Sequence, residues 1–181
     1  MPLPEEQTYT SEDYWNLPDG QRAELIDGQL YDMAPPSRLH QKLIAMLVHS
    51  IQSYIQKNGG TCEVYPAPFA VNLDAKDKDW VEPDISVICD KDKLTDRGCS
   101  GAPDWIVEIV SPSSRRMDYI IKNTLYSQAG VREYWIVDPA KERVTIYHYE
   151  EDAAPMIALF DTPIQVSIYD DLVITMADLL K

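Results

Sequence analysis

Two short segments of this chain are almost entirely apolar, and they limit its fold more than any other feature. The segments 84–89 (DISVIC) and 105–110 (WIVEIV) are rich in β-branched and aromatic residues. Continuous apolar runs of this length are typical of central strands that are buried on both faces. A sheet buried on both faces needs helices on each side, so we expect an α/β protein whose sheet lies between helices.

Two helices are predicted at positions where they could cover such a sheet. Between Ser37 and Asn58, apolar residues recur at intervals of three and four, and Gly59-Gly60 end the pattern. A second helix is predicted from Ser113 or Ser114 to Gly130. Shorter helices are expected from Thr10 to Leu17 and after Thr175, and further strands at 62–65, 69–73, 133–137, 144–149 and 165–168.

The tightest turn is predicted at Asp27-Gly28, which separates two short apolar pairs, Leu25-Ile26 and Leu30-Tyr31. This dipeptide tolerates the positive φ angles of a two-residue hairpin. No linker, repeat or low-complexity block divides the 181 residues, and the polar stretch 74–79 is short enough to be a loop. We therefore expect a single domain over residues 1–181.

The balance of charge bears on the partners that this chain can bind. Thirty acidic residues against sixteen basic ones give a net charge of −14, so the overall field repels phosphate backbones and anionic membranes. No apolar stretch is long enough to span a bilayer, and Met1–Glu6 lacks the basic start of an export signal, so a cytoplasmic protein without a membrane partner is expected. Cys62, Cys89 and Cys99 form no C-x-x-C pair and are expected to be reduced packing residues.

Each of the two central strands carries a carboxylate where packing alone would not put one. Glu108 interrupts the run 105–110, and Asp84 follows Pro83 at the start of the other strand. A buried carboxylate costs several kcal/mol unless a cation or hydrogen bonds compensate it. Taken singly, Asp84 could cap a turn and Glu108 could pair with an arginine across the sheet. Together, on neighbouring strands, they suit Mg²⁺, which takes one or two carboxylates and keeps several waters.

The second helix offers a cation for this pair. Asp118, Lys122 and Tyr126 recur at four-residue spacing and so share a helix face, next to the apolar stripe that must pack on the sheet. Lys122 could therefore fold back over Glu108. The alternative is a surface ion pair between Asp118 and Lys122, of about 0.3–0.5 kcal/mol.

These residues together resemble a known family. The resemblance is carried by Pro83-Asp84, by the segment 108–114 (EIVSPSS), by Asp118, Lys122 and Tyr126, and by the segment 130–139 (GVREYWIVDP). It also takes in the segment 24–28 (ELIDG) and the helix start near His40, and it spans about residues 9 to 180. The pattern is similar to the Uma-two family of restriction-endonuclease-like proteins, within the PD-(D/E)XK nuclease superfamily. It implies a restriction-endonuclease-like mixed β-sheet flanked by helices.

The resemblance implies a metal-dependent DNA endonuclease that hydrolyses phosphodiester bonds with Mg²⁺ or Mn²⁺. Asp84 and Glu108 would hold the ion, with the carbonyl of Ile109 as a further ligand, and Glu24 would bind through water or serve a second ion. Lys122 would orient the attacking water or stabilise the negative charge of the transition state. Tyr126 would orient Lys122.

The sequence departs from the superfamily pattern at one position. The motif E-x-K would place a lysine at position 110, where this chain has Val110, so the resemblance moves the lysine to position 122. Glu24 has the alternative of a solvated residue beside the hairpin. His40 would contact the phosphate or have a structural role.

The net charge leaves a second class of function open. Only Arg38, Lys42, Arg115, Arg116 and Arg132 are cations near the proposed site, so DNA is expected to bind weakly. The alternative is a catalytically idle fold that serves as a protein-interaction module, using the strand 133–137. A homodimer is expected, because two-fold dimers are the commonest soluble oligomers and two sites can cut two strands.

Overall fold

The apolar segments form the middle of a mixed sheet. The computed structural model describes residues 7–74, 78–151 and 153–181. Within these residues, one sheet has the strand order β12-β11-β10-β9-β6-β3, and β9 and β10 are its parallel pair. The bounds are Glu63–Pro66 for β3, Ile85–Ile88 for β6, Trp105–Ile109 for β9, Glu133–Asp138 for β10, Arg143–His148 for β11 and Met156–Leu159 for β12. Every residue of β6, β9 and β10 is buried, as the apolar runs predict.

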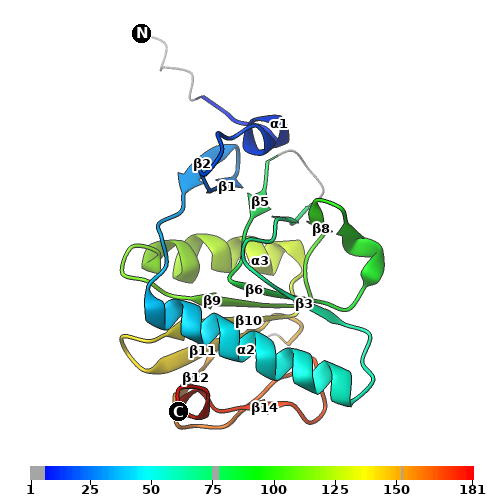
Figure 1. Ribbon diagram of the computed structural model, residues 1–181, viewed down its shortest axis with the longest axis vertical. Coiled ribbons are helices and arrows are strands. Elements are labelled where there is room, and N and C mark those ends of the chain that lie inside the picture. The colour runs from blue at the N-terminus through cyan, green and yellow to red at the C-terminus, as the bar shows by residue number, and fades with distance from the viewer. Residues whose placement is uncertain (1–6, 75–77, 152) are drawn as a thin grey trace.

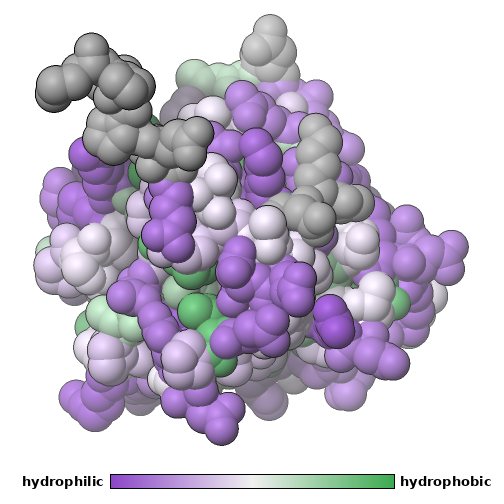
Figure 2. Space-filling model, turned by 90° about the horizontal axis from the view of Figure 1, so that it is seen from above, coloured by the Kyte–Doolittle hydropathy of each residue, from purple (hydrophilic) through white to green (hydrophobic). Residues whose placement is uncertain are grey.

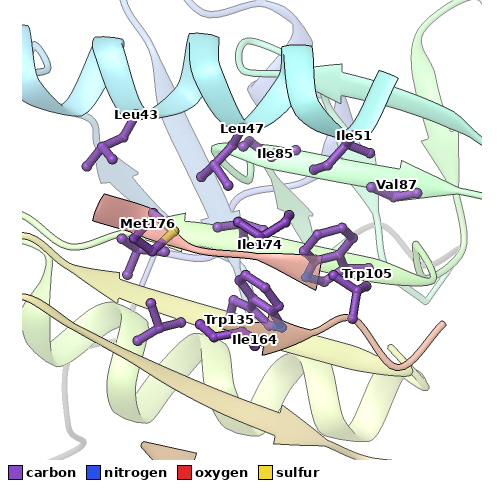
Figure 3. Packing of buried hydrophobic residues seen from close by; sticks show 14 of the residues in the cluster. Leu43, Leu47, Ile51, Ile85, Val87, Trp105, Trp135, Ile164, Ile174 and Met176 are labelled. Carbon is purple, nitrogen blue, oxygen red and sulfur yellow. The ribbon is translucent and has the colours of Figure 1, made fainter. Parts of the chain in front are cut away.

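The long helix α2 (Arg38–Lys57) packs on one face of this sheet (Figure 1). Ser37 begins it by accepting a hydrogen bond from the backbone N–H of His40. Figure 3 shows Leu43, Leu47 and Ile51 directed at the strands, where they meet residues such as Val87. The predicted helix is therefore confirmed, and its apolar face is the one that the periodicity indicates.

The opposite face of the sheet is covered by the second predicted helix, which begins differently from the prediction. Residues Met117–Lys122 form a π-helical segment (η2) that continues into α3 (Asn123–Ala129), and Gly130 ends it with φ of 90°. Tyr126 packs with Ile106 and Ile136, which alternate along their strands with residues of the α2 face. π-helical turns are rare and often lie at functional sites.

A second sheet lies beside the first, with the order β2-β1-β5-β4-β8-β7 among the described residues. Its bounds are Ala23–Ile26 for β1, Gln29–Asp32 for β2, Val71–Asn72 for β4, Trp80–Val81 for β5, Leu94–Thr95 for β7 and Gly98–Ser100 for β8. The hairpin at Asp27-Gly28 is confirmed, with φ of 47° and 74°. α1 (Ser11–Trp15) packs on this sheet, and the predicted loop 74–79 falls partly outside the described residues.

The C-terminal segment completes the cover on the α2 face. The strands β13 (Ile164–Gln165) and β14 (Val173–Ile174) form a small pair, and α4 (Met176–Leu179) follows. Ile174 and Met176 pack in the same cluster as Leu43 (Figure 3). A 3-10 turn, η1 (Lys91–Lys93), precedes β7. The sequence predicted α4 and part of β13, whereas β5, β7, β8, β12 and β14 are too short or too exposed to show a clear alternation.

The expectation that all three cysteines are unpaired is wrong for two of them. Cys62 and Cys89 form a disulfide, while Cys99 is free and buried. The pairing follows from the sheet, since Glu63 is opposite Ile88 in the β3–β6 register and the next position brings Cys62 opposite Cys89. Spacing along the chain could not show this, because the contact depends on which strands pair.

The surface is largely hydrophilic on the face that Figure 2 draws. Figure 2 shows a face covered mainly by hydrophilic residues, with hydrophobic residues visible in small patches between them. None of the helices among the described residues combines the length and the apolar composition needed to cross a bilayer.

Candidate active site

Asp84 and Glu108 lie next to each other on the face of the sheet that η2 and α3 cover. The antiparallel register pairs Ile85 with Val107, and the next position brings Asp84 opposite Glu108. Glu108 Oε2 accepts a hydrogen bond of 3.3 Å from the Asp84 backbone N–H, and Asp84 Oδ2 accepts one of 2.7 Å from the N–H of Ile109. Neither acid pairs with an arginine, so the two predicted residues meet as a pair of carboxylates.

Lys122 supplies the cation of this pair. Its Nζ lies 2.8 Å from Glu108 Oε1 and 2.9 Å from Glu24 Oε1, and its side chain is only 5% exposed. The lysine therefore points into the protein, and the alternative of a surface pair with Asp118 is wrong. Val110, where the superfamily pattern would place the lysine, is buried in the apolar cluster under α3. The ammonium group reaches Glu108 from the helix instead of from the strand.

Glu24 comes to the same place from the second sheet. It lies in β1, it is 4% exposed, and its Oε1 also accepts a hydrogen bond of 2.9 Å from the backbone N–H of Glu82. The alternative of a solvated residue beside the hairpin is therefore wrong. Glu24 holds the lysine from the side opposite Glu108, so the two sheets meet at Lys122.

Asp118 is a fourth buried carboxylate, and the sequence prediction did not include it among the site residues. Its Oδ1 lies 3.9 Å from Lys122 Nζ, and its Oδ2 accepts a hydrogen bond of 2.6 Å from Ser114 Oγ. The four-residue spacing from Lys122 was a usable signal, because it places the two residues on one helix face. The periodicity could not show that this face is buried.

Tyr126 and His40 each contact one of the acids. The Tyr126 hydroxyl donates a hydrogen bond of 2.6 Å to Glu108 Oε1, the same oxygen that Lys122 contacts. Tyr126 thus acts on Glu108, and no direct contact with Lys122 supports the role implied for it. His40 Nε2 lies 3.1 Å from Asp84 Oδ2. Burial lowers the pKa of His40, but its hydrogen bond with Asp84 and the negative charges of Asp84 and Asp118 together outweigh burial and raise the pKa above the ordinary value.

The cluster carries more negative charge than its cations balance. Among the described residues, Lys122 and His40 are the only basic partners in ion pairs with Glu24, Asp84, Glu108 and Asp118. Burial raises the pKa of Glu108 well above its ordinary value although Lys122 opposes this, and burial likewise raises the pKa of Asp118 to about 6. The carboxylates in turn overcome the effect of burial on Lys122 and raise its pKa. The site therefore holds more buried carboxylates than basic side chains to pair with them.

The cluster lies in the wall of a cleft of about 780 Å³, which we call the acidic cleft. One side is formed by the loop 33–36 between β2 and α2, and the other by residues 111–114.

Most of the basic side chains near the cleft already have partners within the protein. Arg22 pairs with Glu82, Arg115 with Asp138 and Arg132 with Asp104 and Glu150, and Lys42 donates to the carbonyl of Leu180. The cleft thus offers few free positive charges to a phosphate backbone.

The oxygen donors fit a magnesium ion. In the part of the chain that the structure describes, no group of three or more His, Cys, Asp or Glu side chains is placed to hold a metal ion by itself. Magnesium does not need one, because it binds through one or two carboxylates and keeps waters in its remaining positions. Asp84 and Glu108 are adjacent hard-oxygen ligands, and the excess of buried negative charge gives them a reason to bind a divalent cation. Ile109 follows Glu108 on the same strand, and its backbone N–H already contacts Asp84.

Comparisons with known proteins identify the family and the fold. The family model "Uma2: Putative restriction endonuclease" matches residues 11–176. An "Uncharacterized protein slr1290" of Synechocystis is 26% identical over 139 residues, which are 76% of this chain and 72% of that protein. A crystal structure from Anabaena variabilis, described as "a putative nuclease belonging to DUF820", superposes with a TM-score of 0.77 at 21% identity and covers 94% of this chain and 96% of its own. This likeness confirms the expected restriction-endonuclease-like α/β fold.

Proposed function

This chain belongs to the Uma2 family, and from that membership together with its buried acid–lysine cluster we propose that it is a magnesium-dependent DNA endonuclease that hydrolyses phosphodiester bonds. The observation that carries the proposal is the convergence of Asp84, Glu108 and Lys122 at one wall of the acidic cleft. A structural ion pair would need one acid for one lysine. Here three buried carboxylates contact the lysine and a fourth, Asp84, lies beside Glu108, and such an excess lowers stability unless a bound cation offsets it.

Asp84 and Glu108 are the residues that would hold the ion, with the Ile109 carbonyl as a further ligand. When bound, Mg²⁺ or Mn²⁺ would polarise the phosphate and lower the pKa of a water molecule. Glu108 accepts a hydrogen bond from the ammonium group of Lys122, and Glu24 forms an ion pair with the same group at 2.9 Å, so two carboxylates orient Lys122 and leave one of its three N–H groups. The third N–H is then available to a phosphate oxygen or to the attacking water. An ammonium group in a buried site stabilises developing negative charge more strongly than it would in water.

Tyr126 holds one carboxylate oxygen of Glu108 in this arrangement. Burial and the charge of Glu108 raise the pKa of the Tyr126 hydroxyl, so it stays protonated and acts as a hydrogen-bond donor. One oxygen of Glu108 is occupied by Tyr126 and Lys122, while the other, Oε2, lies on the Asp84 side. Glu108 can therefore contact a metal ion through one oxygen and keep the lysine in place with the other.

The test is cleavage of several DNA forms in the presence of different divalent ions. The protein is incubated with supercoiled plasmid, linear duplex and single-stranded DNA in Mg²⁺, Mn²⁺, Ca²⁺ or EDTA, alongside the variants Asp84→Asn and Lys122→Met. Asp92→Asn and Lys57→Met are matched controls, since both residues are exposed and lie outside the acidic cleft. We expect cleavage only in Mg²⁺ or Mn²⁺, unchanged in the controls. An absence of cleavage by the parent protein with every DNA would favour the idle interaction module.

A further inference from the structure

A second cleft opens beside the acidic cleft, and aromatic rings line it. It has a volume of about 390 Å³. Its walls include Tyr14, Trp15, Tyr65 and Phe69, together with Arg97, and we call it the aromatic cleft. Trp15 is 37% exposed, although a large apolar side chain on a soluble protein is usually covered. The proposed chemistry of the acidic cleft does not use any of these rings.

The rings are held rigidly by their neighbours. Trp15 makes edge-to-face contacts with Tyr14 and Trp80 at centroid distances of 5.1 Å, and Trp80 Nε1 donates a hydrogen bond of 2.6 Å to Ser11 Oγ. On the other side, Tyr65 and Phe69 stack with their centroids 4.3 Å apart and their planes within 4°. Flat ligands therefore meet fixed aromatic surfaces that lose little conformational freedom on binding.

Arg97 adds a positive charge to this surface. Its guanidinium carbon lies 5.3 Å from the centre of the Trp15 ring, and the residue is exposed. Unlike Arg22, Arg115 and Arg132, it makes no salt bridge within the described residues. An arginine that stacks on an aromatic ring keeps its outer N–H groups available for a phosphate oxygen.

Residues that line the two clefts contact each other. Glu82 lines the aromatic cleft, and its Oε2 accepts hydrogen bonds from Arg22, which lines the acidic cleft. The two clefts are also adjacent at the end of β3, where Ala67 lines the acidic cleft and the next residue, Pro68, lines the aromatic cleft. A polynucleotide strand with a phosphate at Asp84 and Glu108 would therefore have the aromatic cleft as a neighbouring surface.

We propose that the aromatic cleft binds an unpaired nucleobase next to the scissile phosphate, so that the substrate is a single strand or a DNA with an unpaired segment. The bases of a duplex are covered by their stacked neighbours, whereas an unpaired base can place its face on an aromatic side chain. Stacking also supplies affinity that does not depend on neutralising phosphates, which suits a chain with a net charge of −14. The identity of the ligand as a nucleic acid rests on the proposed nuclease function.

Binding of labelled DNA, measured without cleavage, tests this proposal. The probes are an oligothymidylate of about eight nucleotides, matching the site sizes of single-strand-binding domains, and a duplex of the same length. Fluorescence anisotropy is followed in EDTA and in Ca²⁺ for the parent protein and for Trp15→Leu, Phe69→Leu and Arg97→Gln. Lys57→Gln is the control, because it removes one positive charge from an exposed residue at the far end of α2 from His40. Circular dichroism is used to check that each variant is folded.

We expect the single strand to bind at least about tenfold more tightly than the duplex, since only its bases are free to stack. Trp15→Leu should weaken single-strand binding about tenfold, Phe69→Leu and Arg97→Gln by smaller factors, and Lys57→Gln least of all. Arg97→Gln should also reduce the steepness of the salt dependence by about one phosphate contact. Equal binding of duplex and single strand, or variants that bind like the parent, would overturn the proposal.

The outcomes separate this proposal from the nuclease proposal. Single-strand binding that depends on Trp15, without any metal-dependent cleavage, would support the aromatic cleft and reject the nuclease. Cleavage that is the same for duplex and single strand and is unaffected by Trp15→Leu would support the nuclease and reject the role of the aromatic cleft. Sedimentation in the absence of DNA tests whether a second copy of this chain binds in the aromatic cleft instead. If the parent self-associates and Trp15→Leu abolishes this association, the cleft is a site for a second copy and nucleobase binding is rejected.

Discussion

Lys122 Nζ lies 2.8 Å from Glu108 Oε1, although the glutamate is in the middle of the central sheet and the lysine is in the π-helical segment that covers it. The same ammonium group contacts Glu24 of the second sheet. One side chain thus joins the two sheets and the helix at the acidic cleft. Because Lys122 balances several carboxylates at once, its removal should affect the protein differently from the removal of any one acid.

We predict that Lys122→Met lowers both stability and cleavage. The substitution leaves Glu24, Glu108 and Asp118 buried without their shared cation, and breaking a buried ion pair on one side costs about 3–5 kcal/mol. Cleavage should fall by a factor on the order of 100 or more, while Mg²⁺ still binds at Asp84 and Glu108. Chemical unfolding, cleavage assays below the melting temperature and calorimetric metal titration measure the three quantities.

The control for this variant is Lys57→Met, which also removes one positive charge but at an exposed position. It should leave the stability, the cleavage rate and the affinity for Mg²⁺ unchanged. A folded Lys122→Met protein that cleaves DNA as fast as the parent would contradict the role of the lysine. A loss of stability without any effect on cleavage would assign Lys122 to the structure alone.

Glu108→Gln, unlike Lys122→Met, should have little effect on the stability of the metal-free protein. Burial disfavours the charged form of Glu108, and after the substitution Lys122 still pairs with Glu24. The free energy of unfolding in EDTA should therefore change by no more than about 1 kcal/mol. The parent should gain stability when Mg²⁺ is added, because a ligand that binds only the folded state stabilises it, and Glu108→Gln should lose most of that gain.

Thermal unfolding in EDTA and in Mg²⁺ checks this expectation, with Asp92→Asn as the variant of an exposed acid. If Glu108→Gln melts far below the parent in EDTA, the glutamate serves mainly as the structural partner of Lys122. An equal Mg²⁺ effect in parent and variant would exclude Glu108 as a ligand.

The stability of the metal-free protein should fall as the pH rises through the range in which Asp118 titrates. Burial raises the pKa of Asp118 from 3.8 to about 6, so between these values the folded protein binds more protons than the unfolded chain. Stability decreases with rising pH wherever the folded state binds more protons than the unfolded state. For Asp118 the free energy of unfolding should fall by about 1 kcal/mol between about pH 5 and pH 7. The shift of Glu108 has the same sign.

Asp118→Asn isolates this contribution. The free energies of unfolding of parent and variant are measured in EDTA by denaturant titration at several pH values. Relative to the variant, the parent should be more stable at pH 5 than at pH 7 by about 1 kcal/mol. A difference that does not vary with pH would mean that Asp118 is ionised over the whole range.

The disulfide between Cys62 and Cys89 should stabilise the oxidised protein. It closes a loop with a sequence separation of 27, for which the chain-entropy model gives roughly 3–4 kcal/mol. A reducing agent should lower the melting temperature of the parent, and Cys62→Ser should melt near the reduced parent under both conditions. Cys99→Ser serves as the control, because this buried thiol is unpaired. A parent whose melting temperature does not respond to reduction would contradict the prediction.

Much of the fold is determined by patterns that lie within short stretches of the sequence. The apolar runs around Ile85 and Ile106, the periodicity of α2 and the hairpin at Asp27-Gly28 each depend on neighbouring residues, and the structure has all of them. Asp84 and Glu108 could be chosen as candidate site residues for a similar reason, and the structure places them side by side. A carboxylate within an apolar strand requires a compensating group, and this requirement is visible in the sequence itself.

The rest depended on contacts between segments that are distant in the chain. The sequence by itself could not show that Glu24 reaches Lys122, because this contact exists only once the second sheet packs beside the first. Periodicity placed Asp118 and Lys122 on one helix face, but only the packing of that helix decided that the face is buried. Strand pairing likewise decided that Cys62 meets Cys89. Local patterns set the elements and identify the acids, whereas the charge balance of the site is a property of the assembled structure.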